Sequence, residues 1–195
     1  TYTFSRDGEL LTYRFVQSAV TLKVYLAEGK GDLVHRVEMI SGGCLLRKDY
    51  YTCYRVYSEY YIPVNGQACL YLRRFFNQDG SVAYEEVTER DRILYKFPDR
   101  LLYSREELLG YMMSRLKLTR DDTVIIDLEP GMIEKSAFIL NAVPARVGLV
   151  MHADHFWNQD AEHVLWYGIY EYVFAHPEKI SFFITNTDAQ GNLLR

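Results

Sequence analysis

The pattern of the sequence changes near residue 100, and this change limits the possible folds more than any other feature. Residues 1–100 consist of short runs of β-branched and aromatic residues between turn signals, and they contain most of the 17 tyrosines. From Ser104 onward, helical periodicity alternates with short apolar runs. We therefore predict two domains, an antiparallel all-β domain at 1–100 and, at 101–195, a domain with a parallel, doubly wound α/β sheet.

The first domain is expected to be a series of hairpins, because glycines that allow positive φ lie between its predicted strands. These strands are Glu9–Phe15, Val20–Leu26, Leu33–Ile40, Cys44–Lys48, Tyr51–Tyr61, Ala68–Phe76, Ser81–Val87 and Ile93–Phe97. Aromatic residues occupy both alternating faces of Tyr51–Tyr61. One tyrosine-rich face is therefore either packed on another element or bound by a partner. Alternatively, the tyrosines are present only because of their high β-strand propensity.

The second domain begins with a predicted helix, because Ser104 and Glu107 have the spacing of a capping box. Its apolar stripe is Leu108, Leu109, Met112 and Leu116, which we expect to cover a sheet face. The strands and helices that follow are Thr123–Asp127, a short helix at Ala137–Asn141, Val147–Met151, a helix at Ala161–Ala175 and a strand at Ile180–Thr185.

Composition excludes some partners. A net charge of −4 and a pI near 5.7 give no electrostatic reason to expect nucleic acid or an anionic membrane. No apolar run is long enough to span a bilayer. The three cysteines, Cys44, Cys53 and Cys69, show no C-x-x-C spacing, so we expect buried free thiols in a reducing, cytoplasmic compartment.

Polar residues follow the predicted parallel strands where each one ends. Val147–Met151 is too short and too apolar for a surface helix, so it is predicted as a central strand buried on both faces. Ligands bind at the carboxyl ends of such strands. The residues expected there are Asp127, His152, Asp154, His155, Asn186 and Thr187, whereas His35, His163 and His176 are expected to be structural.

Two chemistries remain possible for this group of residues. The two histidines can contact a bound ligand, or His152, Asp154 and His155 can hold zinc or iron in a metal-dependent hydrolase. Glycine-rich phosphate loops of the G-x-G-x-x-G and G-x-x-x-x-G-K types are absent from the sequence. A nucleotide would therefore have to be held by other means.

Three segments in order resemble bacterial retaining glycosyltransferases of the glycogen-synthase-like superfamily: Phe97–Leu108, Met151-His-Ala-Asp-His-Phe156 and Phe182–Gln190. The resemblance is greatest to accessory-secretion-system protein O-glycosyltransferases and poly(glycerol-phosphate) α-glucosyltransferases. It implies the amino-terminal half of a GT-B fold, with an extended β-sheet (meander) domain at 1–100 and a Rossmann-like segment at 101–195.

The resemblance also implies a reaction, the transfer of a sugar from a UDP-sugar, with UDP-GlcNAc as the expected donor, to Ser or Thr of a protein acceptor. His152 would be the catalytic residue that approaches the donor, with Asp127, Asp154, His155, Asn186 and Thr187 contacting donor or acceptor. No cofactor or metal is expected, because the UDP-sugar is a substrate. The family's E-x7-E glutamates would lie outside these residues, so the chain alone is expected to be inactive.

The resemblance further implies a glycosyltransferase-like partner subunit, bound through the β-sheet domain, for which we predict contacts by Arg55, Tyr57 and Arg73. A cytoplasmic protein follows, with peripheral membrane association as an option. The alternative hypothesis is a non-catalytic interaction module that uses the tyrosine-rich sheet, because tyrosine and arginine dominate binding hot spots.

Overall fold

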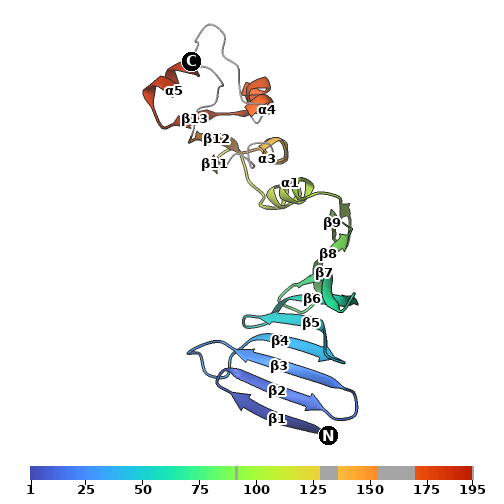
Figure 1. The fold of residues 1–195 in the computed structure, drawn as a ribbon. Coiled ribbons are helices and arrows are strands. Elements are labelled where there is room, and N and C mark those ends of the chain that lie inside the picture. Colours follow the sequence, from blue (N-terminus) through green and yellow to red (C-terminus); the bar gives the residue numbers. More distant parts are fainter. Residues whose placement is uncertain (91, 128–135, 153–169, 195) are drawn as a thin grey trace. The chain divides into compact units, whose positions relative to one another are not determined.

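The computed structural model describes residues 1–90, 92–127, 136–152 and 170–194. It divides into two compact units, Thr1–Ser104 and Arg105–Arg195 (Figure 1). The division falls after Ser104, whereas the predicted boundary is at residue 100. Each unit is described by itself below.

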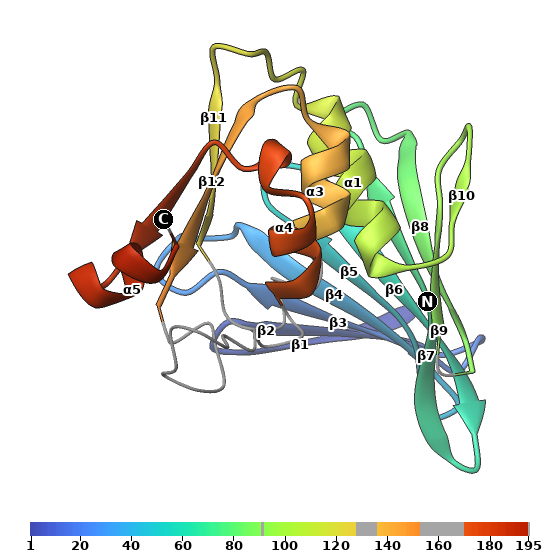
Figure 2. The same cartoon turned by 90° about the horizontal axis from the view of Figure 1, so that it is seen from above.

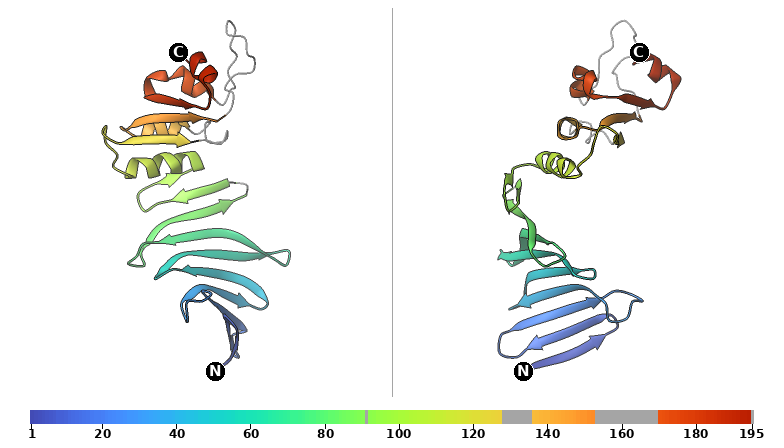
Figure 3. Two further views of the ribbon diagram at one scale, coloured as in Figure 1. Left: turned by 90° about the vertical axis from the view of Figure 1, so that its left-hand side faces the viewer. Right: turned by 180° about the vertical axis from the view of Figure 1, so that it is seen from behind.

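The first unit is one ten-stranded sheet in which every strand pairs with the next strand along the chain (Figure 3). All of these pairings are antiparallel. The antiparallel meander is the predicted architecture. The strands are β1 Tyr2–Asp7, β2 Leu10–Phe15, β3 Val20–Leu26, β4 Val34–Ser41, β5 Cys44–Tyr51, β6 Arg55–Val64, β7 Gln67–Phe76, β8 Val82–Glu89, β9 Arg92–Lys96 and β10 Leu101–Leu102.

This sheet has little apolar core of its own. Its buried residues are Leu26, Tyr95, Asp49, Ser58 and Glu59, so polar groups outnumber hydrophobic ones among them. Burying a polar group is costly unless it is hydrogen-bonded. Ser58 accordingly donates a 2.5 Å hydrogen bond to Asp49 across the β5–β6 pair. Polar cross-strand contacts therefore hold this part of the sheet together.

Three predictions for the first unit are wrong. The edge strands β1 and β10 were not expected, and the predicted strand Tyr51–Tyr61 is interrupted. The backbone turns at residues 52–54, where the Thr52 amide donates to the Tyr54 carbonyl, and β6 begins only at Arg55. The cysteines are free, as expected, but Cys53 and Cys69 are exposed and Cys44 is only half-buried.

The second unit contains a three-stranded parallel sheet in the order β11 Thr123–Asp127, β12 Arg146–Met151 and β13 Phe182–Thr185. The central position of β12 confirms the prediction for this strand. Helices α3 and α4 lie on one side of the sheet (Figure 2). The helical elements are α1 Arg105–Arg115, α3 Ser136–Ala142, α4 Glu171–Ala175, η2 Pro177–Lys179 and α5 Asp188–Leu193.

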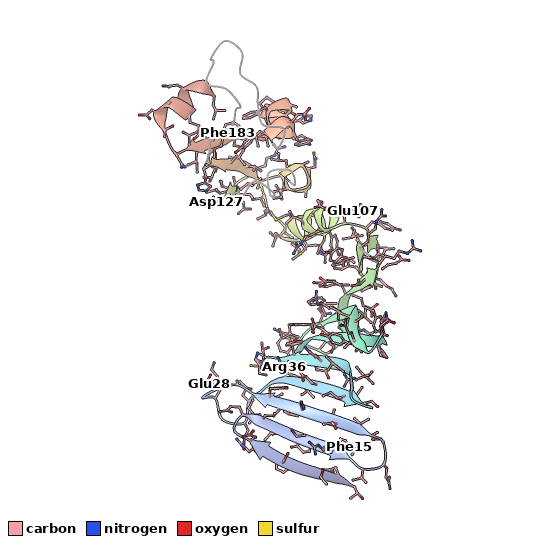
Figure 4. All side chains as sticks on the ribbon, viewed as in Figure 1. Phe15, Glu28, Arg36, Glu107, Asp127 and Phe183 are labelled. Atoms are coloured by element: carbon pink, nitrogen blue, oxygen red, sulfur yellow. The ribbon has the colours of Figure 1, made fainter. Side chains whose placement is uncertain are left out.

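The apolar core of the second unit surrounds β12, where Leu149 and Met151 are completely buried. Val173 of α4 is buried against the same cluster, which extends to Phe183 of β13 (labelled in Figure 4). The expected apolar stripe on α1 is right for Leu109, which packs against the core together with Met113, but wrong for Met112 and Leu116, which are 57% and 61% exposed. Among the described elements, the main contact of this helix is with α3.

The predicted helix Ala161–Ala175 is described only from residue 170 onward, where α4 confirms its last turn. Among the described residues, none of the helices has the length and hydrophobicity needed to cross a membrane.

Candidate functional site

The candidate site lies at the carboxyl edge of the parallel sheet, because all three strands end there. Asp127 is the last residue of β11 and pairs in register with Val150 of β12. His152 follows β12 directly, and Met151 before it pairs with Thr185 of β13. The parallel register therefore brings Asp127, His152 and Asn186 to one edge, as predicted from the sequence (Asp127 is labelled in Figure 4).

Hydrogen bonds link these three residues. The Nε2 atom of the His152 ring contacts the carboxylate Oδ1 of Asp127. The Asn186 side-chain amide donates to the backbone carbonyl of His152 at 2.9 Å. One contact thus orients the imidazole ring and the other fixes the backbone that carries it. Both His152 and Asp127 remain open to solvent, with side chains 54% and 67% exposed.

This geometry determines how the imidazole can act. An ionised carboxylate only accepts hydrogen bonds, so Nε2 of His152 carries the proton in the contact with Asp127. The other ring nitrogen, Nδ1, is bonded by none of the residues that the structure describes. It is available to a ligand, and the neighbouring carboxylate can stabilise a positive charge on the ring. The pair can accept a hydrogen bond or stabilise developing negative charge.

Thr187 stabilises the start of the helix that follows β13 at this edge. It is the N-cap of α5, and its hydroxyl accepts the Gln190 amide at 3.1 Å. The Gln190 side chain is buried, and its carbonyl oxygen accepts a 3.1 Å hydrogen bond from the backbone amide of Asn186. These contacts fix the turn that carries Asn186, and Gln190 was not anticipated from the sequence. An N-cap threonine followed three residues later by glutamine is a capping-box signal that could have identified it.

Asp154 and His155 lie outside the described residues. The described part of the chain contains no group of three His, Cys, Asp or Glu side chains that could hold a metal ion. Among the histidines expected to be structural, His35 approaches the Tyr50 ring and His176 pairs with Glu178 at 3.4 Å.

The predicted partner-binding residues lie on the extended sheet and are engaged with their neighbours. Arg73 on β7 contacts Glu59 at 3.0 Å and Glu86 at 3.4 Å. The Arg55 guanidinium lies 3.9 Å from both the Asp49 carboxylate and the centroid of the Phe76 ring. The side chains of Arg55 and Arg73 are only 36% and 38% exposed. Both guanidinium groups are therefore already paired within the sheet.

Tyr57 belongs to a ladder of stacked rings that crosses five successive segments. Consecutive ring centroids lie 4.3 to 5.5 Å apart, and neighbouring rings are tilted by no more than 26°. In such a stack the ring faces contact one another, so they are not available for stacking on a flat ligand. The ladder consists of Tyr50, Tyr57, Phe75, Tyr84 and Phe97.

Next to this ladder, Glu59 is the centre of a polar cluster. Tyr61, Arg73 and Tyr50 all donate hydrogen bonds to its carboxylate. Burial raises the pKa of Glu59, but these donors outweigh it and lower the pKa below its usual value. Burial, together with the Glu59 charge, raises the pKa of Tyr50 to about 12. The sequence did not reveal this cluster, because it depends on the strand register.

Comparisons with known proteins agree with this architecture. Residues 3–99 match the family model of the GtfA extended beta-sheet domain. The curated UDP-N-acetylglucosamine–peptide N-acetylglucosaminyltransferase GtfA subunit of Streptococcus agalactiae is 39% identical over 191 residues, covering 97% of this chain and 37% of the relative. A chain in a crystal structure of the GtfA/B complex is 39% identical, with a TM-score of 0.76, covering 98% of this chain and 38% of that one.

A chain from a GtfA/B complex bound to UDP and GlcNAc shares only the fold. It is 13% identical, with a TM-score of 0.52, over 94% of this chain and 40% of that one. This chain thus spans well under half the length of the relatives it matches. The predicted resemblance is confirmed: residues 3–99 match the GtfA extended β-sheet domain, and nearly the whole chain is similar to part of a GtfA subunit.

Proposed function

We propose that the full-length protein transfers GlcNAc from UDP-GlcNAc to Ser or Thr hydroxyls of a protein acceptor, with retention of configuration. The observation that carries this proposal is the 39% identity to a GtfA subunit named for that donor and a peptide acceptor. The site geometry is compatible with it. The carboxyl edge of the parallel sheet presents an oriented imidazole in an accessible position.

In this proposal His152 approaches the donor sugar and its phosphates. A preorganised hydrogen-bonding group contributes most where charge develops in the transition state. Asp127 orients the His152 ring and Asn186 holds its backbone, so both are positioning residues. Thr187 supports Asn186 through the Gln190 contact. Asp154 and His155, outside the described residues, are proposed to orient the loop or the acceptor.

No metal is required if basic side chains and a helix amino terminus neutralise the diphosphate. The proposed site belongs to the Rossmann-like segment, residues 101–195, and the extended sheet, residues 1–100, has a separate role. There, we propose, a glycosyltransferase-like partner subunit binds, as the name of the matched GtfA/B complex suggests. Contact of Arg55, Tyr57 and Arg73 with that partner stays a prediction. A cytoplasmic location is part of the same proposal.

The test uses the full-length protein with its partner subunit, UDP-GlcNAc and a Ser/Thr-rich acceptor, with mass spectrometry to detect HexNAc on the acceptor. His152→Ala should lower kcat about a hundredfold or more, because one preorganised contact typically contributes that much. The thermal midpoint should not change, because His152 follows the buried strand and does not fill the core. His176→Ala is the matched control, since it removes a half-exposed histidine of the same unit away from the strand ends.

The proposal fails if the wild-type protein adds no sugar to the acceptor under these conditions. The role of His152 fails separately if His152→Ala retains its kcat. A purely structural histidine would lower the thermal midpoint and leave kcat nearly unchanged.

A further inference from the structure

A cavity of about 450 Å³ lies at the amino edge of the parallel sheet, at the opposite end of β12 from His152. Three segments bring basic side chains to its wall. Arg120 lies in the turn before β11, Arg146 is the first residue of β12, and Lys179 is the last residue of η2. The Arg146 amide donates to the Asp122 carbonyl, so the turn that carries Arg120 lies beside the start of β12. We call this space the amino-edge cavity.

The amino-edge cavity gathers positive charge in a part of the chain that is acidic. Residues 101–195 contain eight Lys and Arg against thirteen Asp and Glu. Three of those eight, Arg120, Arg146 and Lys179, line the cavity, and among its described lining residues Glu178 is the one acidic side chain. The Glu178 carboxylate pairs with His176 at 3.4 Å. The wall of the cavity therefore carries a net positive charge.

These three cations form no ion pair with a carboxylate among the residues that the structure describes. Arg120 and Arg146 are exposed. Lys179 is half-buried, and its ammonium group donates to two uncharged groups, the side-chain oxygen of Asn141 and, at 3.1 Å, the hydroxyl of Tyr172. The hydrogen bond from Lys179 is the largest cause that lowers the pKa of Tyr172. Because like charges repel one another, binding of an anion here would be favourable.

The chemistry of the cavity favours a phosphate group over a carboxylate. Arginine binds phosphate oxygens through two parallel N–H groups, and a phosphate ester carries up to two negative charges against the single charge of a carboxylate. Ser181 adds a hydroxyl to the wall, while its backbone amide already donates to the Val147 carbonyl. Val143 and Pro144 line an apolar side of the cavity, where the organic part of a ligand can pack. Its volume falls within the range of small-molecule sites, about 300–1,000 Å³.

We propose that the amino-edge cavity is a second binding site, for a phosphate-bearing anion held by Arg120, Arg146 and Lys179. The six residues of β12 separate this site from the carboxyl edge by roughly 16 Å, at about 3.3 Å per residue. A phosphate bound here is therefore too far away to contact His152. Two sources share this chemistry, a phosphate ester free in solution and the headgroup of an anionic phospholipid. The inference goes beyond the proposed function and does not depend on it.

The test titrates inorganic pyrophosphate into the full-length protein by calorimetry and measures sedimentation with vesicles of phosphatidylglycerol or of phosphatidylcholine. Arg120→Gln and Arg146→Gln should each raise Kd for the bound phosphate about tenfold or more, because each removes a charged hydrogen-bond donor. Arg115→Gln is the matched control, since it removes the same charge from an exposed position on α1 outside the cavity, and should leave Kd within about twofold. The thermal midpoints of all three variants should match the wild type, because the substituted side chains are exposed.

Pyrophosphate binding that needs Arg120 and Arg146 but not Arg115 would support the inference with a soluble ligand. Binding to phosphatidylglycerol vesicles with the same dependence would support it with a lipid headgroup. Absence of both from the wild type would overturn it, as would an equal loss in Arg115→Gln. Loss of pyrophosphate binding in His152→Ala, with Arg146→Gln unaffected, would place the anion at the carboxyl edge and also overturn it. Because none of these measurements uses sugar transfer, failure of the proposed function would leave the inference standing.

Discussion

Two parts of the extended sheet use the same residue types in different ways. In β5–β9, arginines form ion pairs with largely buried carboxylates, and aromatic rings stack on one another. In β1–β4, aromatic and aliphatic side chains share one face and are only partly covered. Aromatic content alone therefore does not identify a docking surface. The strand register decides which side chains are already engaged.

The largest effect on stability is expected for Arg73→Glu. The substitution removes both ion pairs of Arg73 and places a third carboxylate beside Glu59 and Glu86. Breaking a buried pair costs about 3–5 kcal/mol, and partial exposure reduces this to roughly 2–3 kcal/mol here. Arg6→Glu is the control, because the Arg6–Asp32 pair is exposed and contributes about 1 kcal/mol or less. Chemical denaturation of both variants checks the difference, and equal losses would show that the two parts of the sheet do not differ.

A smaller effect is expected for Tyr57→Ala. The Tyr57 ring lies between Tyr50 and Phe75, with centroids 4.3 and 5.5 Å away. Each aromatic pair contributes about 0.5–1.5 kcal/mol, so the free energy of unfolding should fall by about 1–3 kcal/mol. Tyr54→Ala removes a tyrosine from the turn before β6 and should change stability by less than about 0.5 kcal/mol. Similar losses of unfolding free energy in the two variants would show that ring stacking in the ladder does not stabilise the sheet.

The same ladder predicts a response to alkali. Burial is the main cause that raises the pKa of Tyr50 and of Tyr84 to about 12. The folded-state pKa lies above the unfolded value, so the buried neutral tyrosines contribute to the free energy of unfolding. That contribution is complete below about pH 10 and is lost as pH rises towards 12. Tyrosinate absorbance should therefore show a late-ionising fraction, which Tyr50→Phe reduces. Titration of all tyrosines together near pH 10 would contradict the burial of the ladder.

The smallest effect on stability is expected for Phe4→Glu. The ring is 54% exposed and contacts Tyr13 at a centroid distance of 5.1 Å. Loss of one such pair changes the free energy of unfolding by about 1 kcal/mol or less. Thermal unfolding of the unbound protein measures it. A loss as large as that of Arg73→Glu would mean that Phe4 and Tyr13 belong to a core.

The sequence predicted the parallel sheet well, because β11 and β12 are short apolar runs and β12 is buried on both faces. It also placed Asp127, His152 and Asn186 together, since parallel strands end at one edge. It missed the reversal at residues 52–54, where the turn contains no glycine or proline. The hairpin between β2 and β3 likewise uses Ala19 at positive φ, without a glycine as a signal.

The charged and aromatic ladders could not be predicted for a different reason. Tyr57, Arg73 and Glu86 lie on three different strands, and only the register makes them neighbours. A one-residue slip would place each of them on the other face. Sequence alternation shows which side chains share a face of one strand, but not which strand pairs align. The ion pairs of Arg55 and Arg73 within the sheet could not be foreseen for this reason.

The central claim is that the extended sheet docks the partner and the parallel sheet carries the reaction. The most direct test measures partner affinity for Phe4→Glu and His152→Ala side by side in the full-length protein. We expect Kd to rise about tenfold or more for Phe4→Glu, and to stay within about twofold for His152→Ala while its kcat falls about a hundredfold. Equal loss of partner affinity in the two variants would contradict the claim.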